Sequence, residues 1–351
     1  MREIIIAING LGRIGRAFLK LALKRPEIQI VAVNDLGEIT NMAYLLKYDS
    51  AYGKNDSDIH VEGGELVVDG KRVKYLCEKD PAKLPWRDLG VDIVVESTGL
   101  FTSAEKAKAH LDAGAKRVVI TAPLKESETR SDLGSGERSD LGSGKTVLMG
   151  INEADLASCE VSSNASCTTN AASPLIAILD EAIGIEKAIL NTVHGYTASQ
   201  ALVDGPAKRG WREGRAAAQN IVPSSTGAAI AVTKAFPKLD KLFDGISVRV
   251  PVVAGSIVDV TFIAKRATTA EEVNQILRGA AAAPRWEGIF TVTDEELVSS
   301  DILGNPHASI ADLSMTRVVG GNLVKVLAWY DNEMGYANTL VEHVIKAGTI
   351  N

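Results

Sequence analysis

Cysteine is scarce in this sequence, and its scarcity limits the classes of protein that the chain can belong to. The 351 residues include three cysteines, Cys77, Cys159 and Cys167, and no two of them form a C-x-x-C pair. An odd and sparse set argues against a disulfide framework and against a cysteine-rich zinc site, so no metal site is predicted. The same scarcity favours a reducing compartment, and we expect a cytoplasmic protein.

Long apolar runs and an excess of positive charge are also missing. No stretch approaches the roughly 18 apolar residues of a membrane span, and the run from Ile4 to Ile8 is too short for the core of a signal peptide. Lysine and arginine number 38 against 44 aspartates and glutamates, which makes the formal net charge -6. The chain as a whole therefore offers no general attraction to nucleic acid or to an anionic membrane, and neither partner is expected.

What is present indicates two folded domains, because a domain takes roughly 100 to 200 residues. Apolar residues make up 46% and charged residues 23% of the chain, as in an ordinary globular protein. Up to about Ala165, short apolar runs alternate with helical segments, which is typical of a parallel sheet with crossover helices. Further on, apolar and polar residues alternate as in an antiparallel sheet with one covered face. This second pattern includes Val258, Val260 and Phe262 against Asp259 and Thr261.

Local signals mark two helices. Thr102 and Glu105 form a capping box, and Gly114 ends the helical pattern that follows it. Near the end of the chain, apolar residues fall at i, i+3, i+4, i+7 and i+8, which predicts a terminal amphipathic helix. These residues are Ala337, Leu340, Val341, Val344 and Ile345.

A tandem repeat interrupts the first domain. Residues 129–136 read TRSDLGSG and residues 137–144 read ERSDLGSG, and we interpret the repeat as a surface insertion. The ending Gly144-Lys145-Thr146 also suggests a phosphate-binding P-loop. However, Ser139 stands where that motif needs its first glycine, and the apolar residues 147–149 suggest a strand instead of the required helix.

A glycine-rich turn carries the first chemical signal. Residues 10–15 read GLGRIG, directly after the apolar run Ile4 to Ile8 and at the start of a helical segment. Such glycines let the backbone approach a pyrophosphate, whose charge meets the helix N-terminus. Asp35 follows the second apolar run, twenty positions after Gly15, where a carboxylate accepts hydrogen bonds from the adenosine ribose. It would repel a 2'-phosphate, so NAD is favoured over NADP. The alternative is a glycine turn beside a helix-capping aspartate.

The run SNASCTTN, residues 163–170, carries the second signal. Cys167 is predicted at a helix start with Ser166 as its cap. The helix dipole and a nearby imidazole could lower the thiol pKa by about two units, which would make the thiolate dominant. His194 is the candidate base, because it follows the apolar strand predicted over 188–193. The alternatives are an inert buried cysteine and a histidine that only packs or faces solvent.

Seven motifs stand in the order found in phosphorylating glyceraldehyde-3-phosphate dehydrogenase, and the similarity spans essentially the whole chain. They are GLGRIG, SNASCTTN, TVHGYT, WREGR, SSTGAA, RVP and WYDNEMGY. The chain therefore resembles that family. The resemblance implies NAD-dependent oxidative phosphorylation of D-glyceraldehyde 3-phosphate to 1,3-bisphosphoglycerate through a cysteine thioester, a glycolytic reaction.

The resemblance also implies a role for individual residues. Cys167 would add to the aldehyde, and His194 would raise its reactivity and act as the base. One phosphate pocket would use Thr197 and Arg249, and the other Ser166, Thr168, Arg212, Thr226 and Gly227. The cofactor would contact Gly10, Arg13, Ile14, Asp35, Thr98, Phe101, Thr121 and Asn332, of which the last would hold the nicotinamide carboxamide.

The implied fold is α/β, with a Rossmann-type dinucleotide-binding domain and an α+β catalytic domain whose sheet is mostly antiparallel. We expect residues 1–165 and 334–351 in the first domain and residues 166–333 in the second. The resemblance implies a homotetramer in which the segment 204–215 reaches a neighbouring subunit's cofactor. Ala171 stands where many members have a second cysteine, so an internal disulfide with Cys167 cannot form.

Two other functions remain as alternatives. One is oxidation of erythrose 4-phosphate with hydrolysis of the thioester, as in a sister family. The other is a catalytically silent NAD-binding scaffold that acts through partner contacts.

Overall fold

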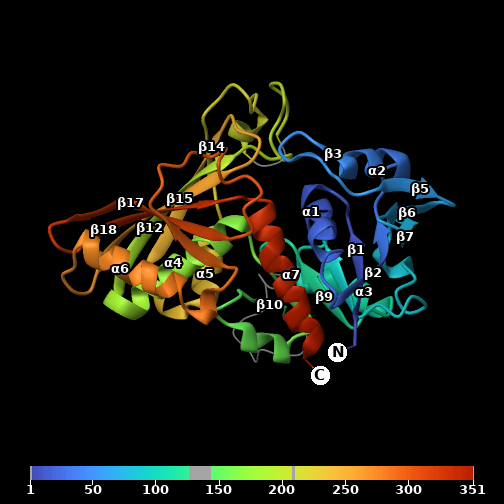
Figure 1. The fold of residues 1–351 in the computed structure, drawn as a ribbon, viewed down its shortest axis with the longest axis horizontal. Helices are drawn as coiled ribbons and strands as arrows, with labels where there is room; N and C mark the ends of the chain where they lie inside the picture. Colours follow the sequence, from blue (N-terminus) through green and yellow to red (C-terminus); the bar gives the residue numbers. More distant parts are fainter. Residues whose placement is uncertain (1, 126–143, 208–209, 351) are drawn as a thin grey trace, which may run out of the picture. The chain divides into compact units, whose positions relative to one another are not determined.

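The computed structural model describes residues 2–125, 144–207 and 210–350 (Figure 1). The tandem repeat, apart from Gly144, lies outside these residues. The chain divides into two compact units, one of Met1–Ala165 with Leu340–Asn351 and one of Ser166–Thr339. No helix among the described residues combines the length and the apolarity that crossing a bilayer requires.

A nine-stranded sheet in the order β10-β11-β9-β8-β1-β2-β7-β6-β5 forms the first unit. Its neighbours from β10 to β7 are parallel. These strands are β1 (Ile4–Asn9), β2 (Ile28–Asn34), β7 (Lys71–Leu76), β8 (Ile93–Glu96), β9 (Arg117–Ile120), β10 (Lys145–Thr146) and β11 (Val161–Ser163). Strands β5 (Ile59–Glu62) and β6 (Glu65–Val68) extend the sheet in antiparallel fashion, and β3 (Tyr48–Asp49) pairs with β4 (Gly53–Lys54).

The middle strands are buried on both faces, as near-continuous apolar runs require. Ile6, Ala7 and Ile8 of β1 are buried, and so are Val94 and Val95 of β8. The chain runs from β1 to β2 and β7 on one side and then returns to β8 on the other side of β1. In open α/β sheets, ligands bind at the carboxyl ends of the strands beside such a change of direction.

Helices α1 (Arg13–Ala22), α2 (Ile39–Lys47) and α3 (Ala104–Asp112) belong to this unit. The predicted cap of α3 is wrong by one residue. The cap is Ser103, whose hydroxyl accepts a hydrogen bond from the Lys106 amide at 3.3 Å. The Thr102 carbonyl instead accepts a bond from Lys125 N at 2.9 Å, so a contact distant in sequence moves the helix start.

The P-loop alternative is also excluded by the fold. Lys145 and Thr146 form strand β10 and pair with Ser162 and Ser163 of β11. Val147 N then donates to the Ser163 carbonyl at 2.9 Å, so the chain stays beside the sheet where a P-loop would begin a helix.

The second unit is built on a seven-stranded sheet in the order β13-β14-β12-β15-β18-β17-β16. β12 pairs with β14, and β16 with β17, in parallel, and the other neighbours are antiparallel, which confirms the predicted mostly antiparallel sheet. The strands are β12 (Ile185–Gly195), β13 (Val222–Ser225), β14 (Phe243–Val250), β15 (Ser256–Ala264), β16 (Phe290–Thr293), β17 (Ser309–Val319) and β18 (Leu323–Tyr330).

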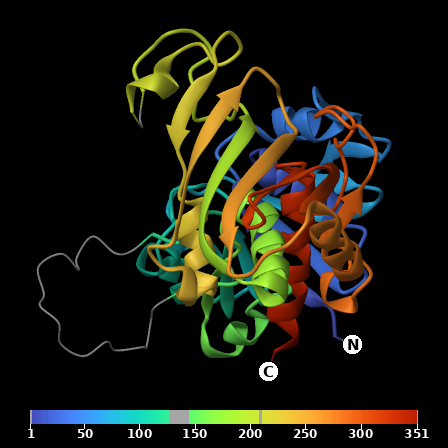
Figure 2. The same cartoon turned by 90° about the vertical axis from the view of Figure 1, so that its left-hand side faces the viewer.

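One face of this sheet is covered by α4 (Cys167–Ile183), α5 (Ala228–Ala235) and α6 (Ala270–Ala281). In Figure 2 the strands lie in front of α4. Val258, Val260 and Phe262 of β15 are buried, whereas Asp259 and Thr261 are only half-buried, as the alternation predicts. Short 3-10 helices complete the chain at Pro81–Lys83, Glu153–Ser158, Trp211–Gly214, Pro237–Leu239 and Pro284–Trp286.

The predicted terminal helix is α7 (Met334–Thr349), whose last part packs within the first unit. A side chain at Gly348 would come within 2.5 Å of Ile4, so the helix lies close against β1. His343 is fully buried, and its Nε2 lies 2.8 Å from Ser162 Oγ and its Nδ1 3.2 Å from Asn164 Oδ1. A buried histidine therefore connects α7 to β11 and to Asn164, the residue that follows it.

Burial of His343 makes stability depend on pH. Desolvation lowers its pKa from the ordinary 6.5 to about 3. Between these values the unfolded chain binds a proton that the folded chain does not, so stability falls as the pH falls. From pH 7 to pH 5 the wild type should lose about 2 kcal/mol more unfolding free energy than His343→Gln. Urea unfolding of both proteins at the two pH values measures the difference, and equal losses would contradict the argument.

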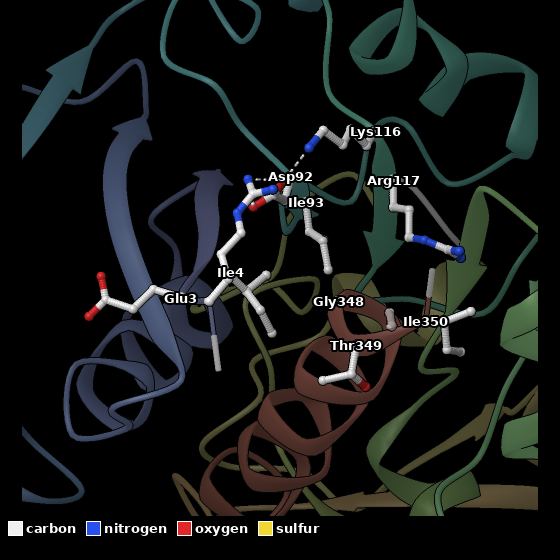
Figure 3. A pocket seen from close by; sticks show the side chains of 11 residues that line it. Glu3, Ile4, Asp92, Ile93, Lys116, Arg117, Gly348, Thr349 and Ile350 are labelled. Carbon is white, nitrogen blue, oxygen red and sulfur yellow. Dashed lines mark hydrogen bonds and ion pairs between the residues drawn. The ribbon is translucent and has the colours of Figure 1, made fainter.

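A cavity of about 520 Å³ opens where β1, β8 and β9 begin, beside the end of α7 (Figure 3). Arg2 and Lys116 are both paired with Asp92 at its rim, at 3.0 and 2.7 Å. Arg117 donates to the carbonyls of Leu156 and Cys159. Arg2, Asp92, Lys116 and Arg117 therefore have partners already, and the cavity lies at the strand ends opposite to those that bind ligands in such sheets.

Candidate active site

The glycine turn after β1 is shaped by close packing. Gly10 has φ +95°, and a Cβ there would lie 2.8 Å from Thr98 N. A Cβ at Gly15 would lie 2.1 Å from the Gly10 carbonyl oxygen, so both positions require glycine. Gly12 caps α1 without a side-chain hydrogen bond, and a Cβ there would meet nothing within 4 Å. The start of α1 therefore leaves room for an anion before its N–H groups, as a pyrophosphate needs.

Asp35, at the end of β2, meets this turn. Its carboxylate accepts hydrogen bonds from Leu11 N at 2.6 Å and from Gly37 N at 2.8 Å. Leu36 beside it is exposed. A carboxylate held against the glycine turn is the arrangement that binds an adenosine ribose, so these residues fit a bound NAD.

Arg13 has a partner that the sequence did not reveal. Its Nη1 donates to Asp49 Oδ2 at 2.9 Å, and its guanidinium lies 5.8 Å from the Tyr52 ring centroid. Burial opposes ionisation of Asp49, but the Ala51 amide and Arg13 outweigh it and lower the pKa of that carboxyl. Asp49 thus positions Arg13 from 36 residues away, a distance over which no local motif signals the contact.

Of the remaining predicted cofactor residues of the first unit, Thr98, Phe101 and Thr121 follow β8 and β9. Thr98 N and Oγ1 bond the Glu96 carboxylate, and Thr121 N donates to the Glu96 carbonyl at 3.0 Å. The Phe101 ring meets His110 edge-on at 6.1 Å. Ile14 lies in the first turn of α1. The fold therefore brings the predicted cofactor residues of this unit to the carboxyl ends of its parallel strands.

Cys167 is the first residue of α4 and has a histidine beside it. Ser166 caps the helix, as expected, with its hydroxyl accepting from Thr169 N at 3.1 Å. Cys167 Sγ lies 3.3 Å from Nε2 of His194, which is held near the end of β12. The thiol and the imidazole are therefore within hydrogen-bond reach, as a nucleophile and its base must be.

The second nitrogen of His194 faces a carbonyl and a cation. Nδ1 lies 2.6 Å from the Gly195 carbonyl oxygen and 2.8 Å from Arg249 Nη1, which also donates to that carbonyl at 3.3 Å. The carbonyl oxygen can accept a hydrogen bond from Nδ1 only when Nδ1 carries the proton, whereas Arg249 Nη1 can donate to Nδ1 only when it does not. In the tautomer with the proton on Nδ1, Nε2 carries no proton and can take one from Cys167.

Burial dominates the ionisation of this pair. Desolvation, and next the charge of Arg249, lower the pKa of His194 to about 3. Desolvation raises the pKa of the Cys167 thiol, although Arg249 and helix N–H groups act in the opposite direction. The expectation of a lowered thiol pKa therefore differs from the structure, because it weighed the helix and the imidazole but not burial. At neutral pH a thiol faces a neutral base, and one proton transfer yields the thiolate.

Tyr330 fixes the surroundings of the pair. Its buried hydroxyl lies 2.9 Å from Thr168 Oγ1 and 2.8 Å from Thr192 Oγ1, and its ring meets His194 edge-on at 6.0 Å. The Thr168 hydroxyl is thus occupied within the protein, which leaves its backbone for any anion. Sequence reasoning included Tyr330 in the WYDNEMGY motif without giving it a role.

The first predicted phosphate pocket lies beside the thiol. Arg249 is opposite His194 in the pairing of β12 and β14. Its Nε is buried and has no hydrogen-bond partner among the described residues, so it is a donor that awaits an acceptor. Thr197 follows β12, with its hydroxyl 3.1 Å from Ser199 Oγ. The structure therefore brings together Cys167, His194 and Arg249.

The second predicted pocket is less complete. Arg212 is exposed in a 3-10 helix and lines a cavity of about 600 Å³ with Glu213, Ser224 and Ser225. Thr226 and Gly227 lie at the start of α5, where Thr226 Oγ1 accepts from Ala228 N. Among the hydrogen bonds of the described residues, none joins Arg212 to either of them or to Cys167.

Asn332 is oriented for an amide ligand. Its Oδ1 accepts bonds from Gly255 N and Ser256 Oγ, both at 3.0 Å. Its amide nitrogen therefore presents the donors, which match the oxygen of a nicotinamide carboxamide.

A Rossmann-type unit joined to a unit in which a thiol lies within hydrogen-bond reach of a buried imidazole indicates the class of the protein, a dinucleotide-dependent oxidoreductase. Residues 4–104 match the family model "Glyceraldehyde 3-phosphate dehydrogenase, NAD binding domain", and residues 166–332 match "Glyceraldehyde 3-phosphate dehydrogenase, C-terminal domain". The chain belongs to the glyceraldehyde 3-phosphate dehydrogenase family. The family match confirms the α/β fold class and NAD as the cofactor.

Curated relatives agree over nearly the whole length. The chain is 47% identical over 338 residues to glyceraldehyde-3-phosphate dehydrogenase of Kitasatospora aureofaciens, covering 96% of this chain and 97% of the relative. It is 43% identical to glyceraldehyde-3-phosphate dehydrogenase B of Aspergillus oryzae, covering 96% of each. It is also 43% identical to glyceraldehyde-3-phosphate dehydrogenase 3 of Saccharomyces cerevisiae, covering 97% of this chain and 99% of the relative.

Proposed function

We propose that this chain oxidises D-glyceraldehyde 3-phosphate with NAD and transfers the acyl group to inorganic phosphate, giving 1,3-bisphosphoglycerate. The observation that carries the proposal is the 3.3 Å contact between Cys167 Sγ and His194 Nε2 at the start of α4, with Arg249 beside it. A thiolate forms thioesters, which phosphate can cleave, and an adjacent base supports both halves of that chemistry.

Cys167 and His194 act in successive steps of this reaction. His194 accepts the thiol proton, the Cys167 thiolate attacks the aldehyde carbon, and the protonated His194 returns the proton to the carbonyl oxygen, which gives a hemithioacetal. NAD, when bound, supplies the acceptor for the hydride from that carbon. His194 then takes the proton of the hemithioacetal hydroxyl, and Cys167 is left as a thioester. A phosphate oxygen attacks the thioester carbonyl, the Cys167 sulfur leaves, and the acyl phosphate is released.

Two phosphate groups must be held during this sequence. We assign Thr197 and the unpartnered Arg249 Nε to one of them. The other is assigned to the start of α4 and of α5 with Arg212, where N–H groups and a guanidinium suit an anion. This second set comprises Ser166, Thr168 through its backbone, Arg212, Thr226 and Gly227.

NAD is assigned to the carboxyl-terminal strand edge of the first unit and to one amide of the second. The contacts in the first unit are Gly10, Arg13, Ile14, Asp35, Thr98, Phe101 and Thr121. The amide is Asn332, whose donors face away from Gly255 and Ser256.

The direct test follows NADH formation with glyceraldehyde 3-phosphate, NAD and inorganic phosphate, and repeats it without phosphate. We expect turnover that requires phosphate. Phosphate-independent turnover with erythrose 4-phosphate would favour the sister activity, and no turnover with either aldehyde would favour a silent scaffold.

Asp35 should set the preference between the two dinucleotides. Asp35→Asn keeps an acceptor for Leu11 N but removes the charge that binds the ribose hydroxyls and repels a 2'-phosphate. We expect the KM for NAD to rise about 10-fold, as for the loss of a charge-assisted hydrogen bond, and the KM for NADP to fall. Initial rates with both cofactors measure this. Asp56→Asn, which removes an exposed carboxylate between β4 and β5, is the control. An unchanged ratio of the two KM values in Asp35→Asn would refute the role.

We further propose a homotetramer in the cytoplasm. Ile189 of β12 and Ile246 of β14 are 66% and 54% exposed, and Trp211 in the segment 204–215 is 95% exposed. Exposed apolar residues of this size support burial against other copies of the chain. Light scattering should give four times the chain mass, and the monomer mass would contradict the assembly.

The free thiols Cys77, Cys159 and Cys167 support a reducing compartment.

A further inference from the structure

Glu96 is a buried acid to which the reaction above gives no part. It is the last residue of β8 and only 1% exposed, and it is paired with Asn9 of β1 on one side and Ile120 of β9 on the other. It therefore lies directly beneath the strand ends where the cofactor residues gather. A carboxylate at such a depth persists only if its oxygens are fully hydrogen-bonded.

Four donors meet the two carboxylate oxygens. Oε1 accepts from Thr98 N at 2.8 Å and from the Thr98 hydroxyl. Oε2 accepts from Asn9 Nδ2 at 2.6 Å and lies 3.0 Å from His110 Nε2. An ionised carboxylate accepts about four hydrogen bonds and donates none, so the set matches its capacity.

The groups at the ends of this network determine in which direction its hydrogen bonds are donated. Trp86 Nε1 can only donate, and it bonds His110 Nδ1 at 3.0 Å. Nδ1 of His110 is therefore an acceptor, and Nε2 is the ring nitrogen that donates to Glu96.

A second series of hydrogen bonds, through Asn34 and Asn9, is also donated toward Glu96. The Glu78 amide donates to Asn34 Oδ1 at 2.9 Å, so the Asn34 nitrogen donates to Asn9 Oδ1 at 2.7 Å. Asn9 must then point its own nitrogen at Glu96. Groups that can only donate therefore converge on Glu96 from two directions, which makes its carboxyl group the terminal acceptor of both chains of hydrogen bonds.

The same network holds the loop 97–101. The Thr98 amide and hydroxyl both donate to Glu96, and Leu100 N donates to Thr98 Oγ1 at 3.1 Å. Phe101 rests edge-on against His110. The loop also packs on the glycine turn, because a Cβ at Gly10 would lie 2.8 Å from Thr98 N.

We propose that Glu96 is a positioning residue for NAD. As a buried acceptor, oriented by Trp86 through His110, it folds the loop 97–101 against the Gly10 turn and so sets the cofactor-binding edge of the first unit. Both donors of Thr98 are used by Glu96, so Thr98 meets the dinucleotide as an acceptor or as a surface and not as a donor. This inference rests on the proposed function only where its test measures KM and kcat values. The Kd of NAD does not depend on that function.

The test replaces Glu96 with glutamine, which has the same shape but one acceptor oxygen and an NH2 group that faces donors. In Glu96→Gln we expect the KM for NAD and the Kd of NAD measured without aldehyde to rise about 10- to 100-fold. The kcat at saturating NAD and the KM for the aldehyde should change less than about threefold. Ser162→Ala, which removes a buried hydrogen bond to His343 in the same unit, is the control for general destabilisation.

Two further variants keep the inference falsifiable. Glu96→Gln and Thr98→Val should be non-additive in NAD affinity if Glu96 acts through Thr98, and additive effects would overturn the mechanism. Should Glu96→Gln fail to fold, Trp86→Phe removes the donor that orients His110 and should still weaken NAD binding several-fold. NAD affinity equal to wild type in the folded variant would overturn the proposal. Absence of aldehyde oxidation in the wild type would instead refute the proposed function, while the NAD titration would still test Glu96.

Discussion

Replacing Cys167 with serine should lower kcat/KM for glyceraldehyde 3-phosphate by about four orders of magnitude or more, while NAD still binds. Serine keeps the size and the helix-start position of the thiol. Its hydroxyl ionises far less readily than a thiol, so His194 is a much less effective base toward it. NADH formation measures the loss, and an NAD titration measures retained binding.

The chain provides a matched control for this substitution. Cys159 is a half-buried thiol in the first unit whose Sγ donates to the Asp155 carbonyl, and burial raises its pKa as it does for Cys167. Cys159→Ser should keep wild-type turnover. If Cys167→Ser retained a rate within tenfold of wild type, covalent catalysis at Cys167 would be ruled out.

Replacing His194 with asparagine should lower kcat by about 10²- to 10⁴-fold, the usual contribution of a positioned base. Asparagine can still hydrogen-bond to the sulfur but cannot accept its proton or that of the hemithioacetal. The measurement is single-turnover NADH formation, which isolates the steps up to the thioester from its cleavage by phosphate.

His60→Asn is the control, since the His60 side chain is 47% exposed on β5 and pairs with Asp58. Its rates should match wild type. Equal single-turnover rates in His194→Asn and wild type would show that another group removes the proton.

Desolvation of Cys167 and His194 explains why a large effect is expected for His194→Asn. Because desolvation raises the thiol pKa and lowers that of His194, both groups favour the neutral form. The thiolate is then formed by transfer across the 3.3 Å contact and stabilised by Arg249 and the start of α4. The large expected effect of His194 follows, since its Nε2 is the base within hydrogen-bond reach of the sulfur.

Several elements could be predicted from short stretches of sequence. The apolar runs correspond to β1, β2, β8 and β9, and the alternating residues of β15 face the core as expected. The helix start at Cys167 with its Ser166 cap and the terminal helix were also predicted. In each case the signal is a periodicity or a cap, and the physical cause acts within one or two turns.

Other features depended on contacts between distant residues. The hairpin strands β5 and β6 were not predicted, since they are short and add to an edge of the sheet. The start of α3 moved to Ser103 because Lys125 engages Thr102. The partner of Arg13 is Asp49, and no sequence motif indicates that these two residues form an ion pair.

By itself, the sequence predicted much of the succession of helices and strands, the glycine turn, the acid at position 35, and a cysteine at a helix start with a candidate histidine at a strand end. These follow from residue type and local spacing. Only the tertiary structure decided the ionisation of Cys167 and His194 and the direction of the hydrogen bonds that end at Glu96. Both depend on burial and on donors from separate strands and helices, and neither quantity exists until the chain has folded.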